Sequence, residues 1–325
     1  MKNKIRYVIF SLLPLLVFTA AGFTQEQDTV RIGYFPNLTH AQALVARENG
    51  FFDSRMEPSV KVEWQVFNAG PSVIEAVFAD HLDIAYVGPS PAINGYVKSE
   101  GAALRVLAGA ASGGAALVVR SDAGISEIKD FHGKKIASPQ LGNTQDVALR
   151  SWLASQKLTL KDKGGDVEVL PLANADQLSL FQKKELDASW SVEPWVSIYR
   201  KKADVKIFLD EASLWPDGKY ATTLVIVRKK FLDRNPELTA KFLAAHRQIT
   251  DWIIQNPEEA KKLVNQGFER VTHKTIDAEI LDQAWKRVTF TTDPMQASVQ
   301  GQASAAHKVG FLKKEPVLAE LVAKT

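Results

Sequence analysis

The 325-residue sequence contains no cysteine, which removes several classes of chemistry at once. There is no disulfide, no thiol nucleophile, no thiolate metal ligand and no residue for lipid attachment after export. The six histidines are scattered without HExxH or a comparable spacing, so we predict no metal site. GxGxxG and P-loop motifs are also absent, and GPSPA at 88–92 lacks the last glycine of GxSxG. We therefore expect a binding protein without a cofactor rather than an enzyme.

The N-terminus has the pattern of a secretory signal peptide. A basic start, MKNKIR, precedes an apolar run over 7–18 and then small residues, so we predict a signal peptide over 1–24, cleaved after Gly22 or Thr24. The run is shorter than the roughly 20 apolar residues of a spanning helix, and Pro14 interrupts it. We therefore predict export to the periplasm of a Gram-negative cell, without lipidation.

The chain that remains after removal of this segment has no net charge. The chain has 40 basic and 37 acidic residues, and the segment contains three of the basic ones, which leaves 37 of each. No basic stripe with interleaved aromatic residues is present either. We therefore expect no nucleic-acid partner and no binding to a membrane surface.

Short strand-like apolar runs alternate with helical patterns up to residue 228, and long amphipathic helix follows. Alternation of this kind predicts an α/β fold with mostly parallel sheets flanked by helices. About 300 residues after cleavage are enough for two domains. The predicted strands cover 30–35, 60–67, 82–88, 104–110, 134–139, 166–172, 186–192 and 222–228, and the main predicted helices cover 41–49, 72–79, 145–156, 175–183 and 236–255.

One corner occurs twice in the sequence. LDIAYVGPSPA at 82–92 and LDASWSVEPW at 186–195 both combine Leu-Asp, small or apolar residues, an aromatic residue and a later proline. We interpret the two copies as equivalent strands in two lobes of similar build. Ligands of open α/β sheets bind beyond the carboxyl ends of the strands, so two such lobes can enclose a cleft.

Residues suited to helix starts follow several predicted strands. Thr39 and Gln42 have capping-box spacing, Ser90 precedes a proline, and Asn143 or Thr144 can cap the helix after 134–139. A helix start offers unpaired N–H groups and about half a positive charge. Because these segments contain no arginine or lysine, they are suited to a small anion held by dipoles.

The sequence resembles the solute-binding proteins of ABC importers for aliphatic sulfonates, taurine and nitrate. The resemblance extends over nearly the whole chain after the signal segment, through RIGYFPNLTHAQALVARENGFF, FNAGPSVIEAVFADHLDIAYVGPSPAI, ISEIKDFHGKKIASPQLGNTQDVALRSWL, WSVEPW and RVTFTTDP. It implies a two-lobe periplasmic binding protein fold of type II, hinged by two crossover strands near 114–117 and 222–225. Lobe 1 would comprise 28–114 and 223–325, and lobe 2 would comprise 115–222.

The resemblance also implies the ligand contacts. The wall from lobe 1 would contain Asn37, Thr39, His40, Asn68, Ala69, Gly70, Gly88, Ser90, Ser112, Gly113 and Gly114. The wall from lobe 2 would contain Asn143, Thr144, Gln145, Trp190, Glu193 and Trp195. Trp190 and Trp195 could face the organic part of a ligand or belong to the core. Glu193 could hold an ammonium group, although we favour a structural carboxylate.

The resulting functional prediction is a monomeric receptor for a small organosulfonate-type anion, either an aliphatic sulfonate or taurine. Its partner would be an inner-membrane ABC permease with a cytosolic ATPase. The alternatives are a neutral heterocycle, such as a pyrimidine precursor of thiamine, and nitrate. Nitrate is less favoured because the nitrate and bicarbonate branch has considerably longer chains. The related pyrimidine-synthesis enzymes need a cysteine-rich motif that this sequence cannot contain.

Overall fold

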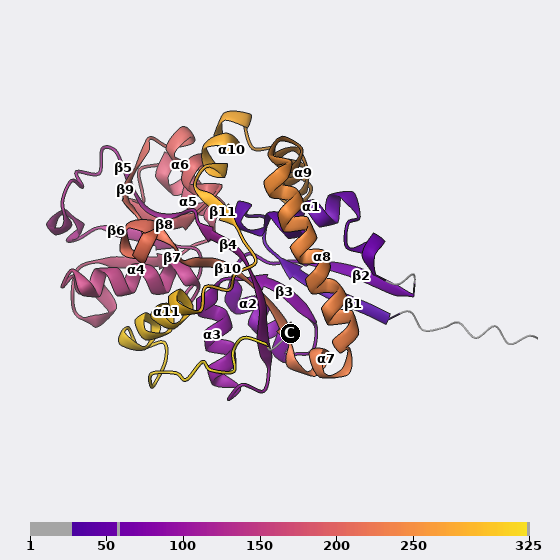
Figure 1. Cartoon of the computed structure of the whole chain (residues 1–325). Coiled ribbons are helices and arrows are strands. Elements are labelled where there is room, and N and C mark those ends of the chain that lie inside the picture. Colours follow the sequence, from indigo (N-terminus) through magenta and orange to yellow (C-terminus); the bar gives the residue numbers. More distant parts are fainter. Residues whose placement is uncertain (1–27, 57–58, 324–325) are drawn as a thin grey trace, which may run out of the picture.

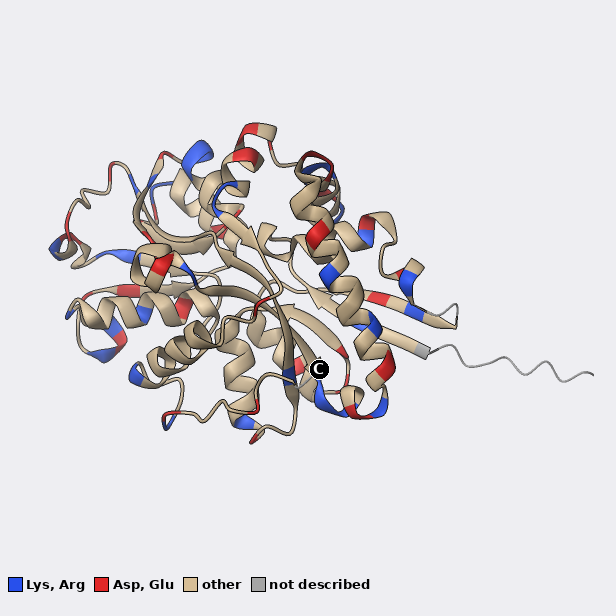
Figure 2. Cartoon of the chain, viewed as in Figure 1, with Lys and Arg blue, Asp and Glu red and all other residues tan. Residues whose placement is uncertain are grey.

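The computed structural model describes residues 28–56 and 59–323, so the predicted signal peptide over 1–24 lies outside the described residues. Two α/β lobes lie side by side, each built on its own sheet (Figure 1). Among the described residues, no helix is both long enough and apolar enough to cross a membrane. Ribbon segments with basic and acidic residues are interspersed over the face shown in Figure 2.

The first sheet contains six strands, and three of its pairs are antiparallel. β1 pairs in parallel with β2 and β3, whereas β10 runs antiparallel to β3 and β4, and β11 runs antiparallel to β4. The spatial order β11-β4-β10-β3-β1-β2 corresponds to Val288–Phe290, Leu104–Gly113, Ala221–Arg228, Ile84–Val87, Asp28–Tyr34 and Val60–Val66.

The second sheet contains five strands with the same kind of arrangement. β6 pairs in parallel with β7 and β8, whereas β5 runs antiparallel to β8 and β9. The spatial order β7-β6-β8-β5-β9 corresponds to Glu168–Pro171, Lys135–Ser138, Ala188–Val192, Ala115–Arg120 and Val205–Asp210. The prediction of mostly parallel sheets was therefore wrong. Both sheets are mixed because each contains a strand, β10 or β5, that arrives from the other lobe and runs against its neighbours.

Two connections join the lobes. β4 ends at Gly113 in the first sheet and β5 begins at Ala115 in the second. The chain returns through 211–220, which includes the short helices η5 (Glu211–Leu214) and η6 (Pro216–Gly218), and enters β10. Gly113 and Gly114 both have a φ of +79°, a conformation that residues with a Cβ rarely adopt. The first connection can therefore turn within two residues.

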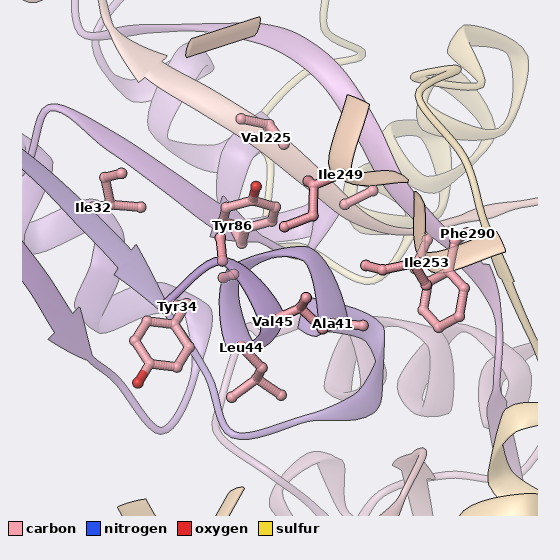
Figure 3. Packing of buried hydrophobic residues seen from close by; sticks show 14 of the residues in the cluster. Ile32, Tyr34, Ala41, Leu44, Val45, Tyr86, Val225, Ile249, Ile253 and Phe290 are labelled. Carbon is pink, nitrogen blue, oxygen red and sulfur yellow. The ribbon is translucent and has the colours of Figure 1, made fainter. Parts of the chain in front are cut away.

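Helices cover both faces of each sheet. Along β3, Ile84 and Tyr86 belong to one core cluster while Ala85 and Val87 belong to another, as expected for alternating side chains. The first cluster contains helices α1 (Ala41–Asn49), α8 (Pro236–Gln255) and α9 (Pro257–Thr272), and Figure 3 shows Tyr86 beside Ile249 of α8. The second contains α2 (Gly70–Phe78), α3 (Pro89–Lys98) and α11 (Gln296–Lys308).

The second sheet is covered in the same way. Trp190 of β8 packs with α4 (Thr144–Ser155) on one face, and Ala116 and Val118 of β5 pack with α5 (Asn174–Gln182) and α6 (Trp195–Lys202) on the other. The remaining helices, α7 (Lys229–Arg234) and α10 (Ala278–Trp285), belong to the C-terminal part of the chain. All of the strands listed from sequence are present, and the predicted helix over 236–255 coincides with α8. β5 was anticipated only as a crossover strand near 114–117, and β9, β11 and α6 were not predicted.

The repeated Leu-Asp corner has one structural role in both lobes. Asp83 precedes β3 and Asp187 precedes β8, and each strand lies between one parallel and one antiparallel neighbour. The backbone N of Asp83 donates to Arg31 O at 3.0 Å, and that of Asp187 donates to Lys135 O at 3.1 Å. Each aspartate side chain accepts a hydrogen bond in return, from Arg31 N and Lys135 N, both at 3.0 Å. The interpretation of equivalent strands is confirmed.

The two aspartates differ in their charged partners. The side chain of Asp83 is 2% exposed and contacts the guanidinium groups of Arg31 at 2.9 Å and Arg228 at 2.5 Å. Burial alone would raise the pKa of Asp83, but the hydrogen bonds from Arg31 and Arg228 outweigh this effect and lower it. Asp187 is 21% exposed, and its one ion pair among the described residues is with Arg120, which has Asp122 as a second partner.

We predict that Asp83→Asn lowers the free energy of unfolding by about 3 kcal/mol, because Arg31 and Arg228 lose a carboxylate that is only 2% exposed, although Arg228 keeps Asp80 as a second partner. Asp187→Asn, the matched control, should cost about 1 kcal/mol or less because this carboxylate is 21% exposed and Arg120 keeps Asp122. Urea denaturation at pH 7 measures both. Because the folded-state pKa of Asp83 is lowered, its contribution is present at neutral pH and is lost as the pH falls below about 4. An equal or larger loss in Asp187→Asn would contradict this account.

Candidate functional site

A narrow cavity lies between the lobes at the ends of the central strands. The space between its walls, including the mouth, is about 360 Å³. The first lobe contributes segments that follow β1, β2 and β3, the second contributes segments that follow β6, β7 and β8, and β10 closes one side. The lining residues are Phe35, Asn37, Thr39, His40, Asn68, Ala69, Gly88, Pro139, Asn143, Gln145, Asn174, Val192, Thr222 and Thr223.

The polar groups of this lining carry no full charge. No lysine, arginine, aspartate or glutamate is among the described residues that line it. Amides predominate, with Asn37, Asn68, Asn143, Gln145 and Asn174, and threonine hydroxyls and one imidazole complete the polar set. Such groups bind by hydrogen bonding and dipoles, so the cavity is suited to a small ligand rich in acceptor atoms.

Besides α3, which starts at Pro89 directly after the lining residue Gly88, three helices begin at the cavity. Asn143 is the N-cap of α4, and its Oδ1 accepts a hydrogen bond from Asp146 N at 2.7 Å. α2 begins just after Ala69 with Pro71 in its first turn, and α5 begins at Asn174. The first turn of a helix carries unpaired N–H groups and a partial positive charge. The three starts therefore favour an anionic or acceptor-rich group in the cavity.

His40 is a neutral member of the lining. It is 2% exposed, and burial lowers its pKa to about 3. Its Nδ1 accepts a hydrogen bond from Phe35 N at 3.3 Å, so the neutral ring carries its proton on Nε2. His40 can thus act as a hydrogen-bond donor whose charge does not change near neutral pH.

The structure brings part of the predicted set together in this cavity. Those residues are Asn37, Thr39, His40, Asn68, Ala69, Gly88, Asn143 and Gln145. Two capping predictions were wrong: Thr39 lies inside the short helix η1 (Leu38–His40), and α3 begins at Pro89 after an N-cap at Gly88, so Ser90 is already helical. The side chain of Gln42 instead donates to Ala110 O at 2.8 Å.

Gly70, Ser90 and Thr144 do not line the cavity. Gly70 begins α2 so close to Pro91 of α3 that a Cβ would clash with that ring. Thr144 Oγ1 accepts a hydrogen bond from Ser90 N at 3.3 Å across the two lobes. The side chain of Thr144 therefore contacts the start of α3, beside the cavity instead of within it.

Ser112, Gly113 and Gly114 form the first crossover behind the cavity. Ser112 Oγ accepts a hydrogen bond from Tyr220 N at 3.3 Å, and Gly113 O accepts one from Thr222 Oγ1 at 2.7 Å. Gly114 O accepts a hydrogen bond from Glu193 N at 2.9 Å. Ser112, Gly113 and Gly114 were predicted to contact the ligand. Their polar atoms instead bond the two crossover segments to each other and to β8.

The two tryptophans do not line the cavity either. Side chains alternate along β8, so Ser189 and Ser191 face α5 whereas Trp190 points to the opposite face, into the core beneath α4. Trp190 Nε1 donates to Glu211 Oε2 at 2.7 Å. Trp195 packs between the lobes, with ring centroids 6.1 Å from Phe268 of α9.

Glu193 is a fully buried structural carboxylate, the role we favoured from sequence. Its oxygens accept hydrogen bonds from Ser197 N at 3.1 Å and Ser197 Oγ at 3.0 Å, at the start of α6. Arg287, which precedes β11 of the first lobe, lies with Nε 2.9 Å from Glu193 Oε1, although its N–H is not aligned for a hydrogen bond. Burial raises the pKa of Glu193 to about 7, and the charge of Arg287 opposes this shift.

Several lining residues were missed from sequence: Phe35, Pro139, Asn174, Val192, Thr222 and Thr223. Asn174 follows the predicted strand over 166–172 and begins a helix, so the rule applied to the other strand ends would have identified it. Thr222 and Thr223 lie at the beginning of β10, where only the geometry of the crossover places them at the cavity. Over 28–56 and 59–323, no group of three or more His, Asp or Glu side chains is placed to hold a metal ion.

Two mixed α/β sheets, two crossovers and a cleft between the lobes define a periplasmic binding protein fold. The structure superposes with a TM-score of 0.75 on the alkanesulfonate-binding protein SsuA from Xanthomonas axonopodis pv. citri bound to MOPS, at 20% identity, covering 92% of this chain and 99% of that one. The predicted fold class is confirmed, apart from the parallel sheets.

The chain belongs to the NMT1-like family, which matches residues 24–266. It is 28% identical over 292 residues to a putative aliphatic sulfonates-binding protein of Bacillus subtilis (strain 168), covering 89% of this chain and 81% of that protein. It is 26% identical over 251 residues to the taurine-binding periplasmic protein of Escherichia coli (strain K12), covering 76% and 73%. These matches confirm the resemblance seen in the sequence.

We predict that Arg287→Ala lowers the free energy of unfolding by about 3 kcal/mol at pH 8, because Glu193 and Asp210 lose a shared cation. The loss should be smaller at pH 6. A carboxyl with a raised folded-state pKa favours folding while protonated, so the ion pair between Arg287 and Glu193 contributes only once Glu193 ionises above about pH 7.

Urea denaturation at both pH values measures the difference. Lys286→Ala removes a neighbouring exposed cation and should show little change at either pH. A loss in Arg287→Ala that is the same at pH 6 and pH 8 would show that the ion pair with Glu193 does not stabilise the fold.

Proposed function

We propose that this protein is the solute-binding component of an ABC importer and captures a small organosulfonate-type anion, either an aliphatic sulfonate or taurine, in the inter-lobe cavity. The observation that carries the proposal is a cavity at which the helices α2, α3, α4 and α5 begin and whose described lining has no charged side chain. A sulfonate spreads one negative charge over three acceptor oxygens, which suits several amide, hydroxyl and backbone N–H donors.

The named relatives support the same class of ligand. One is described as binding aliphatic sulfonates and another as binding taurine. Both names describe binding proteins, which supports a non-enzymatic role, and the name of the taurine-binding relative also supports export to the periplasm. The segment over 1–24 would direct export and be removed, and the absence of cysteine leaves no site for lipidation.

Ligand capture would occur by hinge closure between lobe 1 (28–114 and 223–325) and lobe 2 (115–222). The crossovers at 113–115 and 211–220 would act as the hinge. Two hydrogen bonds join the lobes beside the cavity: Leu38 N donates to Glu193 O at 3.2 Å, and Ser90 N donates to Thr144 Oγ1 at 3.3 Å. These bonds would stabilise a closed form. The closed monomer would then dock on a membrane permease coupled to a cytosolic ATPase.

Two alternative ligands need a direct test. Amide side chains can accept hydrogen bonds as well as donate them, so a neutral heterocycle such as a thiamine pyrimidine precursor is the stronger alternative. Nitrate has acceptor oxygens but no organic part to contact Phe35 and Val192.

A thermal-shift screen with ethanesulfonate, taurine, nitrate, sulfate and thiamine precursors should show the largest stabilisation with a sulfonate, about 2.7 kcal/mol at 100 times its dissociation constant. Stabilisation by a pyrimidine alone would replace the proposed ligand class.

The charge of the ligand is tested at Asn143. Asn143→Asp should weaken sulfonate binding at least about 100-fold, because a carboxylate on the cavity wall repels the anion at short range. The melting temperature without ligand should not fall, since aspartate caps helices as well as asparagine does. Asn143→Ser, an uncharged cap, is the control and should change affinity far less. Isothermal titration calorimetry measures binding, and unchanged affinity in Asn143→Asp would exclude an anion at the start of α4.

A further inference from the structure

A second hollow lies beside the cavity, between α4, α11 and the second crossover. Figure 1 shows α11 alongside α4, and the space between them, including the mouth, is about 700 Å³. We call it the α4 groove. Its lining residues are Ser90, Thr144, Val147, Ala148, Ser151, Trp152, Ser155, Gln156, Glu211, Leu214, Trp215, Gln302 and Ala305.

One face of α4 lines the α4 groove from the first turn of the helix to the last. The lining positions Thr144, Val147, Ser151 and Ser155 recur every three or four residues, which is the spacing of a single helix face. The face carries apolar and hydroxyl side chains but no charge, so α4 supplies a largely apolar wall.

The α4 groove is closed off from the cavity at its inner end. Ser90 N donates to Thr144 Oγ1 at 3.3 Å at this point. Gly88, which lines the cavity, approaches Thr144 so closely that a Cβ at position 88 would clash with its hydroxyl. Since this contact separates the two spaces, a ligand in the groove need not be part of the ligand in the cavity.

Glu211 is the one charged residue among the described lining of the groove. It is 2% exposed, and its Oε2 accepts a hydrogen bond from Trp190 Nε1 at 2.7 Å. No lysine or arginine lines the groove with it, and no ion pair of Glu211 occurs within the described part of the chain. Burying a carboxylate without a cation is costly, so a cation in the groove would be strongly favoured.

Aromatic rings and unsatisfied acceptors complete the surroundings of Glu211. Trp152 and the half-buried Trp215 line the same groove, and indole faces attract organic cations. Ser90 Oγ and Gln302 Oε1 are buried without a hydrogen-bond partner among the described residues, and both residues line the groove. Both atoms can accept hydrogen bonds, which adds to the preference for a positively charged donor.

We propose that the α4 groove is a second binding site, for a small organic ammonium ion held by the Glu211 carboxylate between Trp152 and Trp215. A cavity lined by neutral donors and a groove with a buried carboxylate have opposite preferences for charge. The groove is thus independent of the sulfonate proposal, and either assignment can fail without the other.

Binding in the groove should depend on pH through Glu211. Burial raises the pKa of Glu211 to about 7, the hydrogen bonds from Trp190 and Trp215 oppose the shift, and the charge of Asp210 adds to it. The other ionisable group close to Glu211 is Tyr220, whose pKa burial raises well above its ordinary value, so it stays neutral at pH 6 to 8. Because the cation needs the ionised carboxylate, affinity should rise from pH 6 to pH 8.

Choline chloride is the probe, and 3,3-dimethylbutan-1-ol is its uncharged analogue of the same shape. Titration calorimetry and tryptophan fluorescence on the mature protein at pH 8 should show choline binding at least about 10-fold more tightly than the alcohol. Glu211→Gln keeps an acceptor for Trp190 Nε1 but should lower choline affinity about 10-fold or more and abolish its pH dependence. Glu185→Gln, which removes an exposed charge from the same lobe, should bind choline as the parent does.

Trp215→Leu provides a second variant should Glu211→Gln fail to fold, and it should also lower choline affinity. The proposal is overturned if choline does not bind, if the alcohol binds equally well, or if a folded Glu211→Gln or Trp215→Leu variant keeps parental affinity. None of these measurements includes a sulfonate. A negative result for choline would therefore not count against the proposed function.

Discussion

The coverage of both faces of each sheet by helices is the constraint on which the rest of this structure depends. Ile84 and Tyr86 of β3 face one apolar layer, and Ala85 and Val87 face the other, so the strand has no face left for polar side chains. Unpaired polar groups can therefore collect only where strands end and helices begin. The cavity lies at those ends in both lobes, and its amides follow the strands and precede the helices.

The likeness of the two lobes follows from the same constraint. A strand buried on both faces has no solvent-exposed face to specify its register, so residues at its start must fix the register. Asp83 and Asp187 do so by exchanging hydrogen bonds with the neighbouring parallel strand. The hydrogen bonds with the neighbouring strand recur in both lobes, whereas a buried carboxylate between two arginines occurs at Asp83 and not at Asp187.

Sequence reasoning succeeded where a pattern is local. The helix over 236–255 has its own period of apolar residues, and Asn143 has a cap's spacing to Asp146. Sequence reasoning failed where contacts between segments far apart in the sequence determine the structure. The antiparallel strands arise from chain crossings, and Trp190 faces the core because β8 places it opposite Ser189 and Ser191. The cavity was half anticipated because strand ends are local signals, whereas Thr222 and Thr223 arrive through the second crossover.

The contact between Thr144 and the start of α3 also sets a mechanical limit. Gly88 has no side chain, and the space a methyl group would need is taken by the Thr144 hydroxyl of the opposite lobe. The backbone of Gly88 in one lobe therefore lies directly against the side chain of Thr144 in the other. Because Gly88 has no Cβ, the cavity is narrower at this point than it would be with any other residue. A single carbon at position 88 would act as a spacer between the lobes. The glycine at position 88 therefore determines how narrow the cavity is between the start of α3 and the start of α4.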